Sequence, residues 1–381
     1  MTERYTVLRL PKGGAAGLES YGPDSPAASR VDTTDLSPKD VRELKRDPEV
    51  LAASPDMPVT LVKPVSMPGQ STATSAWGIS TVRADQSRFD GRGTVVAVLD
   101  TGIDSRHPAF AGMDLVEQDF TGEGNGDQNG HGTHCAGTFF GRDVNGQRIG
   151  VARGITRALI GKVIGAKGSG GANAMFQAIH WALTRGARII SMSLSFDFPG
   201  LVSRTIASGC PPELATSRAL EVYRLNLRML DALMMVVNAR VEGDGGAVVI
   251  AAAGNESRKE YKLSVSVPAV AQGVISVGAL AQDGNALSVA DFSNTLPEVC
   301  APGVDILSAQ LGGGLTTKNG TSHAAPHVAG VAAMWWQSLQ GRIPRVKAPN
   351  VIAQMLATAR IDGFAPSVNV PDRGAGLITA P

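Results

Sequence analysis

Short apolar runs, rich in β-branched residues and bounded by Gly or Asp, recur along most of this chain. A continuous apolar run of four to seven residues suits a strand that is buried on both faces, as in a parallel sheet. Helical segments at 172–185 and 217–239 lie between some of these runs, which indicates an α/β fold with a mostly parallel central sheet. In such sheets the catalytic and ligand-binding residues lie at the carboxyl ends of the strands. The runs are residues 94–99, 158–164, 189–194, 247–252 and 274–277.

The composition is ordinary for an enzyme and argues against some classes of partner. The 381 residues include 35 Lys and Arg and 34 Asp and Glu, so the formal net charge is +1. This balance gives no electrostatic reason to bind nucleic acid or an anionic membrane surface. Three scattered cysteines fit neither a disulfide framework nor a paired zinc motif. Without a signal-like apolar stretch or a run of 18 apolar residues, the sequence favours a cytoplasmic protein, and a secreted one would require a leader removed from this chain.

The chain divides into three parts by composition. Residues 1–66 are expected to form a small α+β unit, in which 5–10 and 59–62 have the character of strands and 37–46 begins with Ser-Pro, as helices often do. So few elements cannot build much of a core, so this unit needs a surface to lie against. The remaining parts are a linker at 67–76 and the alternating α/β pattern at 77–381.

The stretch GTSHAAPHVAG places Ser322 at the expected start of a helix. Taken alone, Thr321 and Ser322 fit the role of N-cap residues. A serine acts as a nucleophile only when a base lies within hydrogen-bond reach and a third group orients that base. His323 is a poor base for its neighbour because adjacent helical residues do not face each other. If Ser322 is catalytic, its base must come from elsewhere in the chain.

His131 is the candidate for that base, and Asp100 is the candidate for the acid that orients it. Asp100 follows directly after the first apolar run, where a carboxylate is either a turn former or a functional acid. His131 lies between glycines in NGHGTHCAGT. His134 is three residues further on, but the motif lacks the spacing and the Glu of a zinc-peptidase helix, so no metal site is predicted. The alternative makes His131 the general base for Ser322, with Asp100 orienting it and stabilising the imidazolium.

Asn255 follows the apolar run in AVVIAAAGNES. It is either a simple turn residue or a side-chain amide that donates to a developing oxyanion. With Asp100, His131 and Ser322 in view, the sequence favours the second interpretation.

The segments VVAVLDTGID, HGTHCAGT, AAAGNES and GTSHAAPHVAG, in this order, resemble the subtilisin-like serine peptidases, or subtilases. Subtilisin is a known example of a triad in the chain order Asp, His, Ser and of an Asn oxyanion donor. The resemblance extends over about 77–377 and implies a three-layer subtilisin-like fold. It also implies a serine endopeptidase that forms an acyl-enzyme on Ser322, with Asp100 and His131 completing the triad and Asn255 as oxyanion donor.

The resemblance further implies that a protein or peptide substrate binds as an extended strand between two edge segments. Residues 191–195 and 251–254 match those segments. Many relatives have Gly-Gly where this chain has Ser195 and Phe196, so these side chains are expected to narrow the primary pocket or its rim. The predicted substrate-binding residues are Ser193, Leu194, Ser195, Ala252 and Gly254.

Two regions depart from the rest of the chain. Residues 1–66 loosely resemble the inhibitory propeptide of the family, which implies an intramolecular inhibitor and self-cleavage within 63–73. The alternative is a permanent N-terminal extension. An insertion at about 196–246 carries apolar residues almost all round its expected helix and should be buried, either as a structural helix or as a lid over the cleft.

The predicted chemistry requires no cofactor. Calcium is frequent in the family, but no dense cluster of Asp and Asn with ligand spacing indicates it here. Two rival functions remain: a catalytically silent subtilase fold used as a binding module, and an esterase with the same triad. The presence of all four chemical positions argues against the first rival, and comparing a peptide amide with a matched ester would decide the second.

Overall fold

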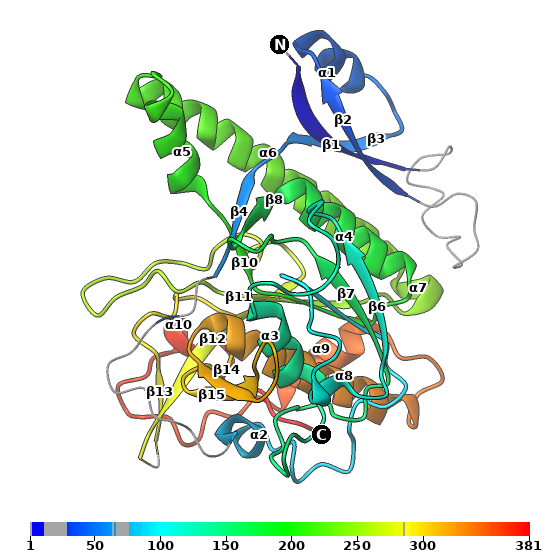
Figure 1. Ribbon diagram of the computed structural model, residues 1–381, viewed down its shortest axis with the longest axis vertical. Coiled ribbons are helices and arrows are strands. Elements are labelled where there is room, and N and C mark those ends of the chain that lie inside the picture. Colours follow the sequence, from blue (N-terminus) through cyan, green and yellow to red (C-terminus); the bar gives the residue numbers. More distant parts are fainter. Residues whose placement is uncertain (1, 11–28, 63–64, 66–75, 285) are drawn as a thin grey trace.

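The computed structural model describes residues 2–10, 29–62, 65, 76–284 and 286–381, in which an α/β body carries a small N-terminal unit on one side (Figure 1). Most of the expected linker at 67–76 lies outside the described residues, and so does most of the range 63–73 expected to contain a self-cleavage site.

A mostly parallel sheet of eight strands forms the centre of the body. Its strand order is β13-β12-β11-β9-β5-β7-β6, and β14 pairs with β12. Among the described strands of this sheet, only β13 pairs antiparallel. Strands occur at all the predicted apolar runs, which confirms the α/β prediction. The bounds are β5 Val96–Asp100, β6 Asp114–Asp119, β7 Arg157–Lys162, β9 Ile189–Met192, β11 Val248–Ala252, β12 Val274–Asp283, β13 Ala286–Val289 and β14 Val299–Pro302.

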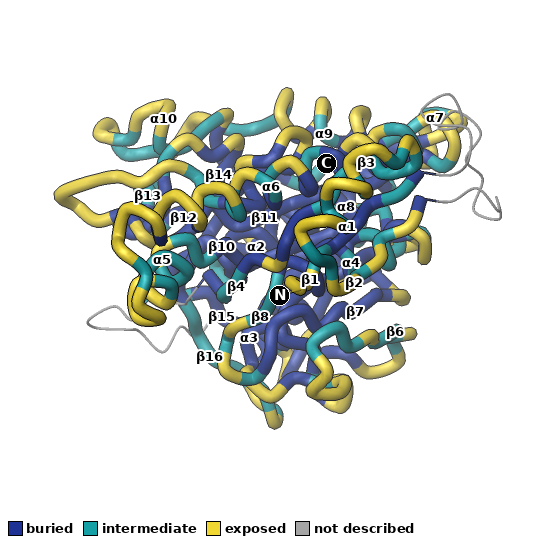
Figure 2. The backbone as a smooth tube through the Cα atoms, turned by 90° about the horizontal axis from the view of Figure 1, so that it is seen from above, coloured by how far each residue is buried: buried dark blue, intermediate teal, exposed yellow. Residues whose placement is uncertain are grey.

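The sheet is buried on both faces. In β5, Val96 and Val98 belong to one apolar cluster whereas Ala97 and Leu99 belong to a second, because side chains alternate across a strand. Helices α3 and α8 contribute to the first cluster, and α4 and α6 contribute to the second. Buried backbone accordingly runs through the middle of the molecule and exposed backbone lies around it (Figure 2). The helices are α3 His131–Phe140, α4 Ala172–Thr184, α6 Pro212–Ala239 and α8 Thr321–Gln340.

Shorter elements complete the body. The shorter elements are α2 Trp77–Thr81, a 3-10 helix at Pro108–Phe110, β15 Ile306–Ala309, β16 Leu315–Lys318, α9 Ala348–Ala357 and α10 Val370–Arg373.

No helix in the described part of the chain combines the length and the apolar character needed to cross a membrane.

The N-terminal unit is a three-stranded antiparallel sheet with one helix. Strand β1 (Glu3–Arg9) lies between β2 (Arg30–Leu36) and β3 (Val50–Pro55). Helix α1 (Pro38–Leu44) begins after Ser37, whose side chain caps it. Strands β2 and β3 were not predicted, because their sequences RVDTTDL and VLAASP contain few large apolar residues. The unit rests on α4 and α6, which supply the surface that it lacks.

The chain then enters the body as one extended strand, β4 (Pro58–Leu61). It pairs antiparallel with β10 (Leu194–Phe196) on one side and with β8 (Ser169–Gly171) on the other. The strand predicted at 59–62 is therefore present, but it forms a sheet with the body and not with its own unit.

The insertion forms α5 (Phe198–Ala207), α6 and α7 (Val241–Asp244). The insertion is buried along only part of its surface, because α5 has no buried residue and α6 exposes large side chains such as Leu220, at 48%. One face of α6 is buried against α4 and β3. The long helix therefore lies between the body and the N-terminal unit (Figure 1).

Candidate active site

Asp100 and His131 lie side by side at the carboxyl edge of the central sheet. Asp100 is the last residue of β5, and His131 is the first residue of α3. One carboxylate oxygen of Asp100 accepts hydrogen bonds from Nδ1 of His131 and from the backbone N–H of Thr101, both at 2.8 Å. Both side chains are almost completely buried. When this imidazole is neutral, donation from Nδ1 leaves Nε2 as a proton acceptor.

Asp127 holds the loop that presents His131. One oxygen of this carboxylate accepts from the hydroxyl of Thr101 and from two backbone N–H groups of the loop, and the other accepts from the N–H and hydroxyl of Thr133. The carboxylate thereby satisfies N–H groups that would otherwise be free near the start of α3. Sequence reasoning missed Asp127; the available signal was an acidic residue shortly before an expected helix start.

Burial and charge act on His131 in opposite directions. Burial lowers the pKa of the imidazole, but charge and hydrogen-bond interactions with Asp100 and Cys135 together outweigh it and raise the pKa of His131 to about 10. The sulfur of Cys135, one turn along α3, is 3.7 Å from Nδ1 of His131. Burial raises the pKa of this thiol, so it is uncharged at neutral pH. The site therefore holds a histidine that loses its proton only at a raised pH.

Ser322, the second residue of α8, faces the end of β4. Its hydroxyl donates to the carbonyl oxygen of Val62 at 2.8 Å. Its backbone carbonyl accepts from the hydroxyl of Ser193 at 3.1 Å and from the thiol of Cys135 at 3.4 Å. Cys135 thus contacts both Ser322 and the ring of His131. Among the described residues Nε2 of His131 has no hydrogen-bond partner, and the Ser322 hydroxyl donates to Val62.

Asn255 lies just beyond β11, and Thr321 orients its amide group. The amide oxygen accepts from the backbone N–H and the hydroxyl of Thr321, both at 2.9 Å. The amide nitrogen lies on the side of Gly320, where an added Cβ would be only 2.8 Å from it. Gly320 also has φ +151°, which favours glycine. This glycine therefore leaves room for the amide immediately before the Ser322 helix.

Three of the predicted substrate-binding residues line β4. The carbonyl of Ser193 accepts from the N–H of Val62 at 3.2 Å. Leu194 and Ser195 belong to β10, which pairs with β4 in antiparallel register. Their backbone therefore forms one edge of the position that β4 occupies.

The other edge of β4 is formed by a segment that was not matched in the sequence. Strand β8, and not the segment 251–254, lies on this side. Ala252 is inside β11, and the N–H of Gly254 donates to the Thr321 hydroxyl at 3.1 Å, beside the Ser322 turn. Strand β8 was missed because its three residues, Ser-Gly-Gly, carry no apolar pattern.

Comparisons with known proteins identify the family of this chain. A model of the "Subtilase family" matches residues 91–376. The chain belongs to the subtilase family. This subtilase is 32% identical over 306 residues to the thermostable alkaline protease of Halalkalibacterium halodurans, covering 79% of this chain and 70% of that protein. It is 32% identical to subtilisin DY of Bacillus licheniformis, covering 75% of this chain and 92% of that protein.

A third relative of the subtilase is the intracellular serine protease of Paenibacillus polymyxa. The two are 33% identical, and the match covers 76% of this chain and 79% of the relative. Together with the family model, these relatives identify the chain as a serine endopeptidase that acts on protein or peptide substrates. They also confirm the three-layer α/β fold predicted from the sequence.

Other histidines of the subtilase surround the site and make packing contacts. Nε2 of His134 lies 3.0 Å from the carbonyl oxygen of Ile306 and joins α3 to β15. Nδ1 of His327 donates to the carbonyl of His323 within α8. The ring of His323 packs against His134 and His131, with centroids 4.4 and 5.3 Å away. Burial lowers the pKa of His134, His323 and His327, so these three are neutral.

One group of potential metal ligands occurs in the described part of the subtilase. It consists of Asp100, His131 and Cys135, whose ligand atoms all lie within 4.8 Å of one another. A thiol and an imidazole suit soft metals, whereas calcium takes oxygen ligands. The group therefore does not fit calcium, and the expectation that no cofactor is required stays a prediction.

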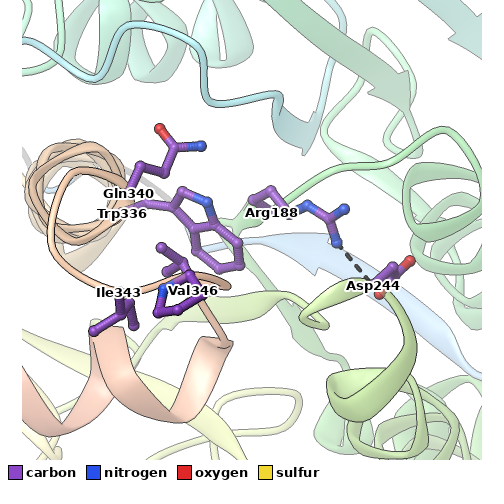
Figure 3. A pocket seen from close by; sticks show the side chains of 7 residues that line it. Arg188, Asp244, Trp336, Gln340, Ile343 and Val346 are labelled. Carbon is purple, nitrogen blue, oxygen red and sulfur yellow. Dashed lines mark ion pairs between the residues drawn. The ribbon is translucent and has the colours of Figure 1, made fainter.

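A cavity of about 220 Å³ lies beside Arg188, the residue before β9, and Figure 3 shows the side chains that line it. Arg188 pairs there with Asp244 at 3.3 Å, and its guanidinium carbon is 5.7 Å from the ring centroid of Trp336. The charges of the described lining residues are thus paired with each other, and the cavity offers no free charged group for catalysis. Its lining also includes Gln340, Ile343, Pro344 and Val346.

Proposed function

We propose that Asp100, His131 and Ser322 form the catalytic triad of this serine endopeptidase and that Asn255 is an oxyanion donor. The observation that carries the proposal is the position of Val62, whose carbonyl oxygen lies 2.8 Å from the Ser322 hydroxyl. A peptide carbonyl thus already occupies the place where the nucleophile would attack.

Each residue then has one role in peptide hydrolysis. The Ser322 hydroxyl first rotates from the bound carbonyl to Nε2 of His131, which takes its proton as the oxygen attacks the carbonyl carbon. Asp100 holds the imidazole and stabilises its cation. The amide of Asn255 and the backbone N–H of Ser322 bind the oxyanion. His131 gives the proton to the departing amine, and water then cleaves the acyl-enzyme by the same steps.

Replacing Asn255 with Ala is expected to lower kcat by about 10²–10³, the range found for such a donor in subtilisin, while KM changes little. The reason is that the amide binds a charge that exists only in the transition state. Steady-state kinetics on a peptide amide would measure this, and an effect confined to KM would contradict the oxyanion role.

We also propose that residues 1–66 are an intramolecular inhibitor, joined by a linker at 67–76 to a catalytic domain at 77–381 with an insertion at about 196–246. Support comes from β4, which fills the space between β10 and β8 and blocks the approach to Ser322. A cavity of about 330 Å³ remains between the unit and α6, so their interface is incompletely packed. Incomplete packing favours release of the unit after a cut.

Incubation of the purified chain is expected to produce a cut directly after Val62. This residue occupies the P1 position, the one that supplies the scissile carbonyl, and the cut lies at the start of the expected range 63–73. Intact-mass spectrometry would locate it, with Ser322→Ala as a control that stays whole. An active enzyme that remains uncut would support a permanent N-terminal extension instead.

We also propose an intracellular location, on the basis of the cysteines and of one relative. Cys135, Cys210 and Cys300 are all free thiols, as a reducing compartment would keep them. One relative is named an intracellular serine protease. Fractionation of the source cells, with activity assayed in the medium and in the lysate, would test this location.

A further inference from the structure

The insertion lies beside the end of β4 that arrives from the N-terminal unit. Its first helix, α5, follows β10 directly, and the backbone N–H of Asp197 donates to the carbonyl of Pro58 at 2.9 Å. Tyr223 of α6 packs edge-on against Phe196 of β10 and Phe198 of α5, with ring centroids 6.3 and 5.7 Å apart. An aromatic cluster therefore fixes both insertion helices to the strand that pairs with β4.

The body also binds the chain upstream of β4. With Val62 as P1, Met57 is P6 and Pro55 is P8. The carbonyl of Met57 accepts from the backbone N–H of Ala172, at the start of α4, at 2.8 Å. The carbonyl of Pro55 accepts from the side-chain amide of Asn226, in α6, also at 2.8 Å. Hydrogen bonds from the body thus extend eight residues back from the scissile bond.

Side chains along this segment alternate in burial. Met57, Val59 and Leu61 are 0%, 1% and 6% exposed, whereas Pro58 and Thr60 are only partly buried. The three buried residues belong to an apolar cluster that α4 and α6 share with Leu8 and Leu10 of the N-terminal unit. An extended strand buries alternate residues when one of its faces lies on a surface. The side chains at P2, P4 and P6 therefore lie on the face of the segment that packs into this cluster.

Asn226 is an unusual residue for a buried helix face. It is completely buried, and its amide nitrogen also donates to the carbonyl of Val222 in its own helix at 2.9 Å. Its amide oxygen has no partner among the described residues. Burying an amide costs free energy that an apolar residue would avoid. The hydrogen bond from the Asn226 amide to the carbonyl of Pro55 explains why a polar residue is buried at this position.

We propose, on the basis of the triad assignment, that the α5–α6 insertion lengthens the non-prime side of the substrate groove, so that this subtilase recognises an extended polypeptide out to P8. A large apolar side chain binds at P6, in the place that Met57 fills, and Asn226 binds the P8 carbonyl. The preferred substrates are extended or unfolded segments with apolar residues at alternate positions. Release of the N-terminal unit opens the same surface to other chains.

Three peptides with a fluorogenic amide after the P1 residue test this proposal: residues 55–62, the same peptide with Met57→Gly, and residues 59–62 alone. Fluorophosphonate titration fixes the concentration of active, self-processed enzyme. We expect kcat/KM for the eight-residue peptide to exceed that for the four-residue peptide by about 10- to 100-fold. Gly at P6 should remove most of this gain, because burial of a Met side chain contributes about tenfold or more.

The enzyme variant Asn226→Ala is expected to lower the ratio of the two kcat/KM values, eight-residue over four-residue, by about fivefold. The matched control Asn238→Ala changes an exposed residue of α6, about 18 Å further along the helix, and should leave this ratio unchanged. The ratio separates groove binding from damage to folding, which lowers both values equally.

Equal kcat/KM for the eight- and four-residue peptides would overturn the proposal, and so would a ratio that Asn226→Ala does not change. The contacts of residues 55–58 would then serve only to dock the N-terminal unit. Hydrolysis of neither peptide by the wild-type enzyme would instead overturn the triad assignment, and the proposal with it.

Discussion

Ser322→Ala is expected to lower kcat for a peptide amide by about 10⁶, the size of loss found for the nucleophile of subtilisin. The methyl group has no lone pair to attack the carbonyl and no proton for His131 to take. The fold should survive, because the hydroxyl of Ser322 bonds only to Val62 among the described residues. Initial rates on a peptide amide measure the loss, and circular dichroism reports the fold.

Ser338→Ala is the matched control for this variant. Ser338 lies in the same helix and is also buried, and its hydroxyl has no partner among the described residues. Its loss should leave kcat near the wild-type value. Comparable activity of the Ser322 and Ser338 variants would show that Ser322 is not the nucleophile.

Asp100→Asn is expected to lower kcat by about 10⁴ and to shift the pH profile. The carboxylate raises the pKa of His131, and the base works only when neutral, so kcat/KM of the wild type falls as pH falls through this raised pKa. The Asn variant loses the attraction that favours the cation, so the pKa of His131 drops. The acidic limb of kcat/KM should therefore move to lower pH.

Measurement of kcat/KM across pH tests both parts of this prediction. Asp114→Asn serves as the control, because Asp114 is an exposed carboxylate of β6 that pairs with Arg157 on the surface. The Asp114 variant should have the same acidic limb of the kcat/KM profile and the same kcat as the wild type. If the acidic limb of the kcat/KM profile does not move in the Asp100 variant, then the Asp100 carboxylate does not set the protonation of His131.

The sequence predicted the residues that stand at the ends of strongly apolar strands. Asp100 ends β5 and Asn255 lies just beyond β11, and the runs of Val, Ile, Leu and Ala in these strands identify them as buried without reference to the rest of the fold. His131 and Ser322 were predicted from glycine-rich helix starts. The pairing of Asp100 with His131 was expected from the resemblance of their segments to the subtilases, because His131 begins a helix and does not itself end a strand.

Features that depend on distant pairing could not be predicted in the same way. Strand β8 is Ser-Gly-Gly and becomes a strand only because β4 lies beside it. The pairing of β4 with the body depends on where the N-terminal unit docks. Asp127 looks like an ordinary loop acid until its carboxylate is seen to bind the start of α3. These features arise from tertiary contacts and leave no periodic pattern in the chain.

Mapping the residue that a fluorophosphonate labels in the active enzyme tests the central claim most directly. The reagent forms a covalent bond with an activated serine, so peptide sequencing by mass spectrometry identifies the nucleophile. The triad assignment predicts one labelled residue, Ser322, with labelling lost in step with activity in Asp100→Asn. An active enzyme that carries its label on another residue would contradict the assignment.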